Sequence, residues 1–542
     1  MTAMPPAVAT VWHPELFAFG CDALPALPEP TPERLGFKAY NLQRMALLGL
    51  PVPPAFVLGT GLCASAATRA AGASAALWGP GLAALEQATG LRLGDPRRPL
   101  LLSVRSGAPV SMPGMMETLL NIGLSDATLD GFIRQTGQPR LAWDAYRRLV
   151  AGFGEIVAGI PAQRFEAELA AFGPGRSERE LDFAELRALT RRCLAVYAQA
   201  AGRPFPQDPR EQLQQAIAAV FGSWQSDKAR AYRAAHHISD AIGTAVTVQT
   251  MVFGNAGVSS GAGVGFTRDP SSGANALWVD FLFNAQGEDV VSGRRSAHGH
   301  AQLAEVLPEV WAQLHVATAL LESAFGDMQD FEFTVQQGRL YLLQTRSGKR
   351  TPQAAARIAL DLLAQGLIDA DTARERTAAL DEPALALLRV VASDGAPLQP
   401  LASAAAASAG VAVGEIAFDA ARAAARRADG AEVILVRRDA ETADMAALQH
   451  ATGLLTQRGA RTSHAAVVAR QMGRVCLVGC EALQLDEQRR ELRVGEQVLA
   501  EGALITLDGN EGQVYAGAAQ TQRWVDPALL DGLARLRAGD AG

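Results

Sequence analysis

The sequence predicts a multidomain α/β protein. Its 542 residues are too many for one ordinary domain and indicate two to four domains. Helical stretches alternate with short, glycine-rich, strand-like runs from about 13 to 350, and a denser alternation of strands and helices follows from about 411 to 520. Apolar residues make up 49% of the chain, which is enough to bury large cores.

The middle of the chain separates these two zones. We expect helices from about 351 to 395, because AAARIALDLLAQGL and DADTARERTAALDEPALALLRVV carry apolar residues three and four positions apart. The next segment, SDGAPLQPLASAAAASAG, is rich in alanine, serine and proline and has no apolar period. We therefore expect this segment to be a linker.

The last zone has the pattern of a compact α/β domain. Its predicted strands are VAVGEIAF, AEVILVRR, TGLLTQRG, VCLVGC and ALITLD. Its predicted helices are DAARAAARRA, DMAALQHA and SHAAVVARQMG. One short amphipathic helix is expected in the final segment, TQRWVDPALLDGLARLRAGDAG.

Composition excludes several classes of protein. The 49 basic and 56 acidic residues are mixed along the chain, so no nucleic-acid surface is expected. We find neither a leader peptide nor an apolar run of about 18 residues, and we expect no membrane span. Five cysteines do not form a disulfide framework, and Cys476 and Cys480 lie in an apolar strand with poor zinc-ligand spacing. A soluble cytoplasmic protein is expected.

The segment GLLTQRGARTSHAAVVARQMG places His464 at the predicted start of a helix. Thr462 and Ser463 can cap that helix, and its free backbone N–H groups stabilise a nearby anion. An imidazole there can attack phosphorus and carry a phosphoryl group, with Arg458 and Arg461 as cations for it. By itself, the same pattern also fits a capping or packed histidine.

This segment resembles the signature of the phosphoenolpyruvate-utilising enzymes, G-G-x-[ST]-S-H-A-A-[IV]-[VL]-[AS]-R. The resemblance implies that His464 is the phosphoryl carrier of a swivelling β/β/α phosphohistidine domain. Two positions depart from the pattern: Ala460 replaces a glycine, and Arg461 stands where dikinases often have methionine. Neither departure removes the nucleophile, although Ala460 can restrict a loop that needs a positive φ.

Six further segments resemble the pyruvate phosphate dikinase family and follow the family order from residue 35 to 351. They are LGFKAYNLQRMALLGLPVPPAFVL, LLSVRSGAPVSMPGMMETLLNIGL, GTAVTVQTMVFGN, SGAGVGFTRDPSSG, NAQGEDVVSGRR and DMQDFEFTVQQGRLYLLQTRSGKRT. The resemblance implies an ATP-grasp nucleotide-binding domain. We therefore expect the ATP-grasp domain at 13–355, a helical segment and linker at 356–399, the phosphohistidine domain at 400–520 and a tail at 521–542.

The nucleotide-binding segments carry residue types suited to a phosphate chain and its metal. Lys38 and Arg105 are cations, and Gly114 lets backbone N–H groups approach a phosphate. Glu332 and Gln344 offer the oxygen ligands that Mg²⁺ prefers, on two strands predicted to be adjacent.

The resemblance implies a role for each of these residues. Lys38, Arg105 and Arg346 bind the phosphates of ATP, and Arg105 and Arg346 stabilise charge during transfer. Glu288 lies near the transferring phosphates or the metal, and Glu332 and Gln344 hold Mg²⁺. The loop that covers the nucleotide contributes Met112, Gly114, Met115 and Thr118.

Some assignments stay open at this stage. Gly261, Gly263 and Gly265 fit a glycine-rich strand better than a phosphate loop. Asp144 and its neighbours in WDAYRRLV resemble a family helix but also fit an ion-paired helix face. The family's G-G-K-G run keeps its lysine but has Phe37 and Ala39 in place of two glycines, and Asp280 stands where the family has glutamate.

In the family, a (β/α)8 barrel that binds pyruvate and phosphoenolpyruvate follows the histidine domain. Such a barrel needs about 250 residues, and only residues 518–542 remain after ALITLDGNEGQVYAG. We therefore expect the half-reaction that phosphorylates His464 from ATP and phosphate, with a separate barrel protein as acceptor. The alternatives are a different acceptor or a non-catalytic ATP sensor, and a homodimer is left open.

Overall fold

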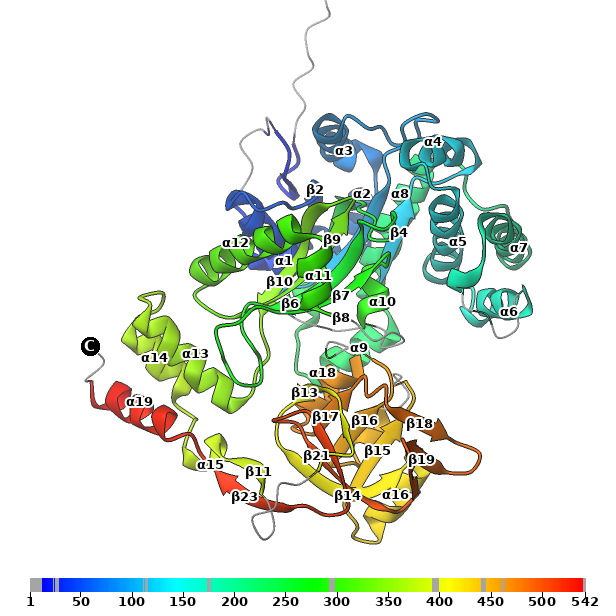
Figure 1. Ribbon diagram of the computed structural model, residues 1–542. Helices are drawn as coiled ribbons and strands as arrows, with labels where there is room; N and C mark the ends of the chain where they lie inside the picture. The colour runs from blue at the N-terminus through cyan, green and yellow to red at the C-terminus, as the bar shows by residue number, and fades with distance from the viewer. Residues whose placement is uncertain are drawn as a thin grey trace, which may run out of the picture. The chain divides into compact units, whose positions relative to one another are not determined.

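The computed structural model describes residues 12–22, 24, 29–110, 112, 116–172, 176, 178–291, 298–391, 399–439, 445–459, 461 and 464–539. The chain divides into two compact units, many of whose helices and strands are labelled in Figure 1. The first comprises Met1–Val252 with Tyr341–Gln344, and the second comprises Phe253–Leu340 with Thr345–Gly542.

The first unit contains an antiparallel five-stranded sheet of order β1-β2-β5-β3-β4. Its strands are β1 (Leu16–Phe19), β2 (Ala55–Leu58), β3 (Leu102–Gly107), β4 (Thr118–Ile122) and β5 (Ala245–Thr250). Nearly every residue of β1, β2, β3 and β5 is buried. Such continuous burial is typical of strands with both faces covered.

Helices surround this sheet and extend the unit on one side (Figure 1). They are α1 (Pro32–Leu47), α2 (Ala66–Gly72), α3 (Ala75–Thr89), α4 (Asp126–Thr136), α5 (Pro139–Ile156), α6 (Gln163–Phe172), α7 (Phe183–Ala201), α8 (Pro209–Ser223) and α9 (Asp227–Ala235). Asp182 and Glu185 form a capping box that begins α7. Phe153 and Tyr197 each pack edge to face against Phe205.

The second unit begins with a sheet of order β10-β9-β6-β7-β8, so the predicted adjacency of the strands carrying Glu332 and Gln344 is confirmed. Its strands are β6 (Gly261–Phe266), β7 (Trp278–Phe283), β8 (His298–Gly299), β9 (Gln329–Gln336) and β10 (Arg339–Ser347). The helices that accompany it are α10 (Gly287–Val291), α11 (His300–Val306) and α12 (Pro308–Phe325).

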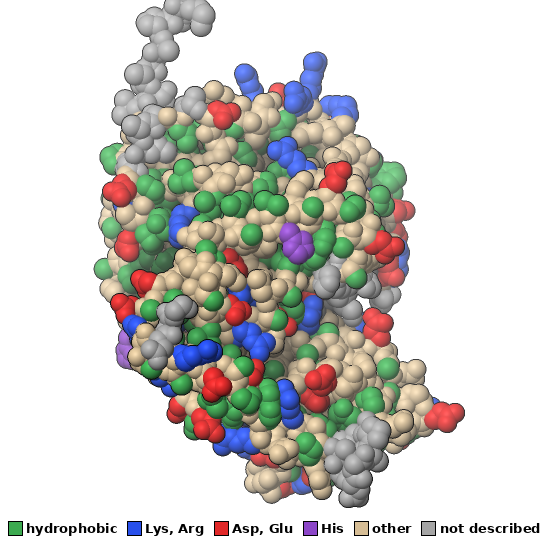
Figure 2. Space-filling model, turned by 60° about the vertical axis from the view of Figure 1, so that its left-hand side comes forward, with side chains coloured by type: hydrophobic (Ala, Val, Ile, Leu, Met, Phe, Trp, Pro, Cys, Tyr) green, Lys and Arg blue, Asp and Glu red, His purple; other side chains and the backbone are tan. Residues whose placement is uncertain are grey.

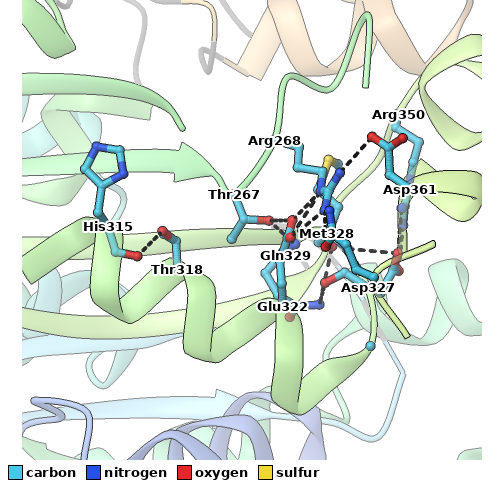
Figure 3. A network of polar contacts seen from close by, with 12 residues as sticks. Thr267, Arg268, His315, Thr318, Glu322, Asp327, Met328, Gln329, Arg350 and Asp361 are labelled. Atoms are coloured by element: carbon cyan, nitrogen blue, oxygen red, sulfur yellow. Dashed lines mark hydrogen bonds and ion pairs between the residues drawn. The ribbon is translucent and has the colours of Figure 1, made fainter. Parts of the chain in front are cut away.

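A buried arginine fixes the chain at the end of β6. Arg268 has no exposed surface and donates to both carboxylate oxygens of Glu322, at 2.9 and 3.0 Å, and to Asp361, at 3.1 Å (Figure 3). Thr267 donates to the same glutamate at 2.7 Å. Breaking such a buried pair costs about 3–5 kcal/mol, so this network holds β6, α12 and α13 (Pro352–Ala364) together.

Helices from two distant parts of the chain form one small core. α13, α14 (Ala370–Thr377) and α15 (Glu382–Leu385) pack against α19 (Pro527–Ala538). The predicted helices at 351–385 and at the C-terminus are confirmed. The helix predicted to continue to about 395 is wrong, because Leu387–Val391 is a strand, β11, that pairs antiparallel with β23 (Gln520–Trp524). Its partner lies far along the sequence, so local periodicity does not reveal it.

The remaining residues form a separate eight-stranded sheet of order β12-β22-β21-β14-β15-β16-β17-β13. Four neighbours, β14 to β17, run parallel, and short helices connect them. The strands are β12 (Ala402–Ser403), β13 (Ala405–Ser408), β14 (Val411–Ala417), β15 (Val433–Arg437), β16 (Gly453–Thr456), β17 (Val475–Val478), β21 (Leu504–Asp508) and β22 (Gln513–Ala516). The helices are α16 (Ala420–Ala428), α17 (Met445–Leu448) and α18 (His464–Gln471). All five strands predicted in this zone are confirmed.

Part of the predicted linker is a strand. β13 lies within the alanine- and serine-rich run, pairs with β17 and buries Ala407 completely. Small side chains allow this strand to pack closely against α18, so it lacks the large apolar residues that usually mark a strand. A three-stranded sheet of β18 (Leu483–Asp486), β19 (Glu491–Val494) and β20 (Gln497–Ala500) completes the domain.

The surface agrees with the mixed charge of the sequence. On the face shown in Figure 2, acidic and basic side chains are interspersed among apolar and polar ones. Among the described residues, no helix has the length and apolar character to cross a membrane. The helices, strands and separate sheets described above confirm the predicted α/β multidomain fold.

Candidate functional site

Lys38 lies directly after a break in α1. Gly36 has φ 72° and ψ 154°, which interrupts the helix, and a Cβ atom at this position would lie 2.1 Å from the carbonyl oxygen of Gly107. The break therefore requires glycine, and it brings the base of Lys38 beside Gly107 in β3. The Phe37 backbone N–H donates to the Ala108 oxygen at 3.2 Å, so the absence of the family's other glycines does not prevent this close approach.

Arg105 lies on β3, two positions before Gly107. Its register partner on β4 is Thr118, and its partner on β5 is Thr247. The structure thus brings three predicted site residues, Lys38, Arg105 and Thr118, to the same end of β3. Two cations in this position form a local positive region suited to phosphate groups.

The loop between β3 and β4 is described only in part. Met112 is buried, with 7% of its surface exposed. Gly114 and Met115 lie outside the described residues. Glu117, at the end of this loop, forms an ion pair with Lys228 of α9. The predicted covering role of the loop stays a prediction.

An acidic and basic cluster lies on β9 and β10 in the second unit. Arg346 donates to Asp330 at 2.8 Å and also interacts electrostatically with Glu332. Asp330 and Glu332 are two positions apart in β9 and therefore lie on the same face. Burial raises the pKa of Asp330, and the positive charge of Arg346 opposes that rise.

Asp330 was not identified as a site residue from the sequence. The signal was present in DMQDFEF, because strand alternation places Asp330 on the face of Glu332. With it, the second unit offers two carboxylates beside an arginine. Oxygen donors of this kind are what Mg²⁺ prefers, so the residues present fit the predicted metal.

The other predicted ligands are less completely described. Gln344 is buried in β10, with 7% of its surface exposed, and belongs to the first unit. Glu288 lies in α10, and its side chain is outside the described part of the chain. Among the described residues, no group of three or more histidine, cysteine, aspartate or glutamate side chains is placed to hold a metal ion.

Close packing against aromatic rings explains why β6 carries three glycines. A Cβ atom at Gly261, Gly263 or Gly265 would lie 2.1, 2.3 or 2.8 Å from the ring of Phe281, Phe333 or Phe331. The rings of Phe281 and Phe333 stack at 5.7 Å. This packing confirms a glycine-rich strand and accounts for the glycines without a phosphate contact.

The WDAYRRLV helix carries a buried ion network. Asp144 accepts from Arg147 at 3.0 Å and from Arg148 at 3.1 Å, and Glu178 pairs with both arginines. Burial opposes ionisation of Asp144, but the two guanidinium groups hold its pKa below the usual value. Of the two interpretations, the contacts favour the ion-paired helix.

His464 is the first residue of α18, as the motif predicts. The parallel strand β16 leads into the turn before this helix, and Gly459 in the turn has φ 126°. The side chains of Thr462, Ser463 and His464 lie outside the described part, so the capping prediction stays untested. A loop at the carboxyl end of parallel strands is the usual place for a functional group in an α/β domain.

The cysteines of this domain are structural. Cys476 is fully buried in β17, and burial raises its pKa to about 12. Burial likewise raises the pKa of Cys480 to about 11. Thiols of this kind are poor nucleophiles at neutral pH. Neither of these two cysteines therefore competes with His464 as the predicted nucleophile.

Comparison with known proteins identifies the family of both parts. Residues 82–304 and 299–366 match the family described as pyruvate phosphate dikinase, AMP/ATP-binding domain. Residues 430–512 match the PEP-utilising enzyme, mobile domain.

The curated relatives agree with these matches. Pyruvate, phosphate dikinase 2 of Oryza sativa subsp. japonica is 44% identical over 491 residues, which cover 89% of this chain and 55% of that protein. Pyruvate, phosphate dikinase of Clostridium symbiosum is 41% identical over 498 residues, which cover 90% and 57%. The chain thus spans about half the length of the curated relatives it matches, and it belongs to the pyruvate phosphate dikinase family.

Proposed function

We propose that this chain phosphorylates its own His464 from ATP, as the nucleotide half of a dikinase reaction. The imidazole attacks the β-phosphorus of ATP, a nitrogen–phosphorus bond forms, and the bond between the β-phosphorus and the α,β-bridging oxygen breaks, so that AMP leaves with that oxygen. Inorganic phosphate then accepts the terminal phosphoryl group and leaves as pyrophosphate. One phosphoryl group stays on His464.

The observation that carries this proposal is the combination of His464 at the first position of α18 with a full set of phosphate-binding residue types elsewhere in the chain. Lys38 and Arg105 both lie at the end of β3, and Arg346 lies beside two carboxylates. Fixed charges aimed at the transferring group supply most of the rate in phosphoryl transfer.

The residues of this chain have separate roles in the proposal. Lys38 and Arg105 bind and orient the phosphates, and Arg346 stabilises charge that develops during transfer. Glu332 and Gln344 hold Mg²⁺, and the loop with Met112 and Thr118 covers the nucleotide, together with Gly114 and Met115. When bound, Mg²⁺ neutralises phosphate charge and fixes the phosphate oxygens. Glu288 lies near this region by resemblance.

The test is labelling with ATP that carries ³²P at the β-position, in the presence of Mg²⁺. We expect acid-labile, base-stable label on the wild type and release of AMP. His464→Ala abolishes the label, while His450→Ala, an exposed histidine of the same domain, keeps it. Label that persists in His464→Ala would reject His464 as the phosphorylated residue. ATP binding without any label would reject autophosphorylation and favour a non-catalytic ATP sensor.

The acceptor in the proposed second half is pyruvate on a barrel supplied by a separate protein. The support is the name of the relatives, which refers to pyruvate. Purified phosphorylated chain is mixed with a candidate barrel protein and pyruvate, and phosphoenolpyruvate is measured. Transfer to another acceptor, with none to pyruvate, would leave the first half intact and replace the second.

A further inference from the structure

Arg461 lies three residues before His464, and its side chain reaches the sheet of β6, β7 and β9. The guanidinium carbon lies 3.9 Å from the centroid of the Trp278 ring, and Nη2 lies 3.5 Å from Oδ1 of Asp280. Trp278 and Asp280 are two positions apart in β7, so they share a face of the strand. One side chain of the phosphohistidine domain thus contacts two side chains of this sheet.

The face that receives Arg461 is largely buried. Asp280 exposes only 3% of its side chain, and the Trp278 ring packs against Phe266 with a centroid separation of 5.2 Å. A carboxylate in such a place is stabilised by a nearby cation, and a guanidinium over an indole ring is favourable. Both contacts are lost together when the domain moves away from the sheet.

A second arginine holds the backbone at the same point. Arg470 donates from Nη2 to the carbonyl oxygen of Arg461 at 3.4 Å and from Nε to that of Ala407 at 2.7 Å. Its guanidinium carbon lies 5.6 Å from the centroid of the Phe266 ring. Because Arg470 is on α18, the helix that begins at His464 is tied to the position of Arg461.

Charge is complementary across this contact. The phosphohistidine domain contributes the guanidinium groups of Arg461 and Arg470. The sheet contributes Asp280, and the carboxylates of Asp330 and Asp269 interact with Arg470. Opposite charges on the two faces favour one docked orientation over others.

We propose that Arg461 is a positioning residue, which clamps the phosphohistidine domain on Trp278 and Asp280 in the orientation from which His464 reacts with ATP. The inference rests on the proposed autophosphorylation and adds to it the contact that sets the orientation. The family often has methionine at position 461 and usually has glutamate at position 280, so this arginine–aspartate pair depends on this chain's own residues.

The docked orientation can be measured independently of the phosphoryl-transfer reaction. Spin labels are attached to cysteines that replace Val258 and Val498, which are 89% and 46% exposed, in a chain with Cys21→Ser. The distance distribution between the labels is compared for the wild-type background, Arg461→Met and the control Arg493→Met. We expect a narrow distribution for the background and the control, and a broader one for Arg461→Met. An unchanged distribution in Arg461→Met would overturn the clamp.

Single-turnover labelling at saturating ATP measures the positioning role. We expect Arg461→Met to slow labelling of His464 about tenfold, with an unchanged dissociation constant for ATP. Adding Asp280→Asn to Arg461→Met should cause little further loss, because the two residues act through one contact. Labelling at the wild-type rate, or faster, would overturn the positioning role.

The proposed autophosphorylation and the proposed clamp by Arg461 can be refuted separately. Absence of label on the wild-type chain refutes the proposed function and with it the role of Arg461 in the reaction. The distance distributions then still decide whether Arg461 docks the domain. A broad wild-type distribution beside normal labelling would refute the clamp and leave autophosphorylation standing.

Discussion

The nucleotide-binding regions and the phosphohistidine domain are built in different ways. In the nucleotide-binding regions, the candidate residues Lys38, Arg105 and Glu332 come from a broken helix and from strands far apart in the sequence. In the mobile domain, one continuous segment supplies the strand, the turn, the helix and the proposed nucleophile, His464. In the proposed reaction, charge stabilisation is therefore shared among several groups, whereas nucleophilic attack depends on one.

The largest graded effect should come from the cations. We expect Arg105→Ala or Lys38→Ala to slow labelling of His464 by about 10²–10³-fold, which is the usual cost of removing one group that stabilises the transition state. His464→Ala should abolish it. Labelling rates are measured in single turnovers at saturating ATP.

Arg210→Ala serves as the control for this comparison, because Arg210 is exposed at the start of α8. It should label at the wild-type rate. If Arg105→Ala and Lys38→Ala were also indistinguishable from the wild type, the shared-charge description of the nucleotide-binding regions would be wrong.

A smaller effect should show whether the backbone conformation beside Lys38, and not only the charge of Lys38, contributes to ATP binding. Gly36→Ala adds a Cβ atom 2.1 Å from a backbone oxygen at φ 72°, whereas Gly49→Ala meets no atom within 4 Å at φ 74°. Both substitutions place a Cβ atom at a positive φ, which costs about 1–3 kcal/mol, but only Gly36→Ala moves the backbone beside Lys38. We expect weaker ATP binding in Gly36→Ala and unchanged binding in Gly49→Ala, measured by titration calorimetry. Equal affinities would show that the break in α1 does not shape the site.

Much of the fold follows from the sequence because its strands are continuous apolar runs. VILV and VCLV are buried over their whole length in a parallel sheet, which the sequence pattern alone indicates. β11 and β13 were not predicted as strands, because each is stabilised by pairing with a strand distant in the chain, β23 and β17 respectively. An alanine-rich run such as β13 carries no local signal that distinguishes strand from linker.

In the candidate site, too, local motifs are predictable from the sequence and contacts between distant residues are not. The motif places His464 correctly at the start of a helix. The helix break beside Lys38 and the strand that carries Arg105 are seen only in the structure. The contact of Arg461 with Asp280 joins residues 181 positions apart, and no spacing rule predicts it. The motif predicts Arg461 as a cation for the phosphoryl group, and this stays a prediction; the described contacts of its side chain are with Trp278 and Asp280.

The smallest expected effect tests stability within the phosphohistidine domain. Asp419 caps α16 by accepting from the backbone N–H of Arg422 at 2.7 Å. Asp419→Ala should lower the free energy of unfolding by about 1 kcal/mol, because an N–H at the helix start loses its partner. Urea unfolding measures this loss, and labelling of the folded chain should be unchanged. A large loss of labelling would mean that α16 contributes to the site.

The central claim is that His464 takes the β- and γ-phosphoryl groups of ATP together. The most direct measurement compares ATP labelled with ³²P at the β-position or at the γ-position, before and after phosphate is added. We predict that both labels bind the wild-type chain in the absence of phosphate. On addition of phosphate, the γ-label should leave as pyrophosphate while the β-label stays on the protein. Stable attachment of the γ-label, with no β-label on the chain, would identify an ordinary kinase transfer and contradict the account.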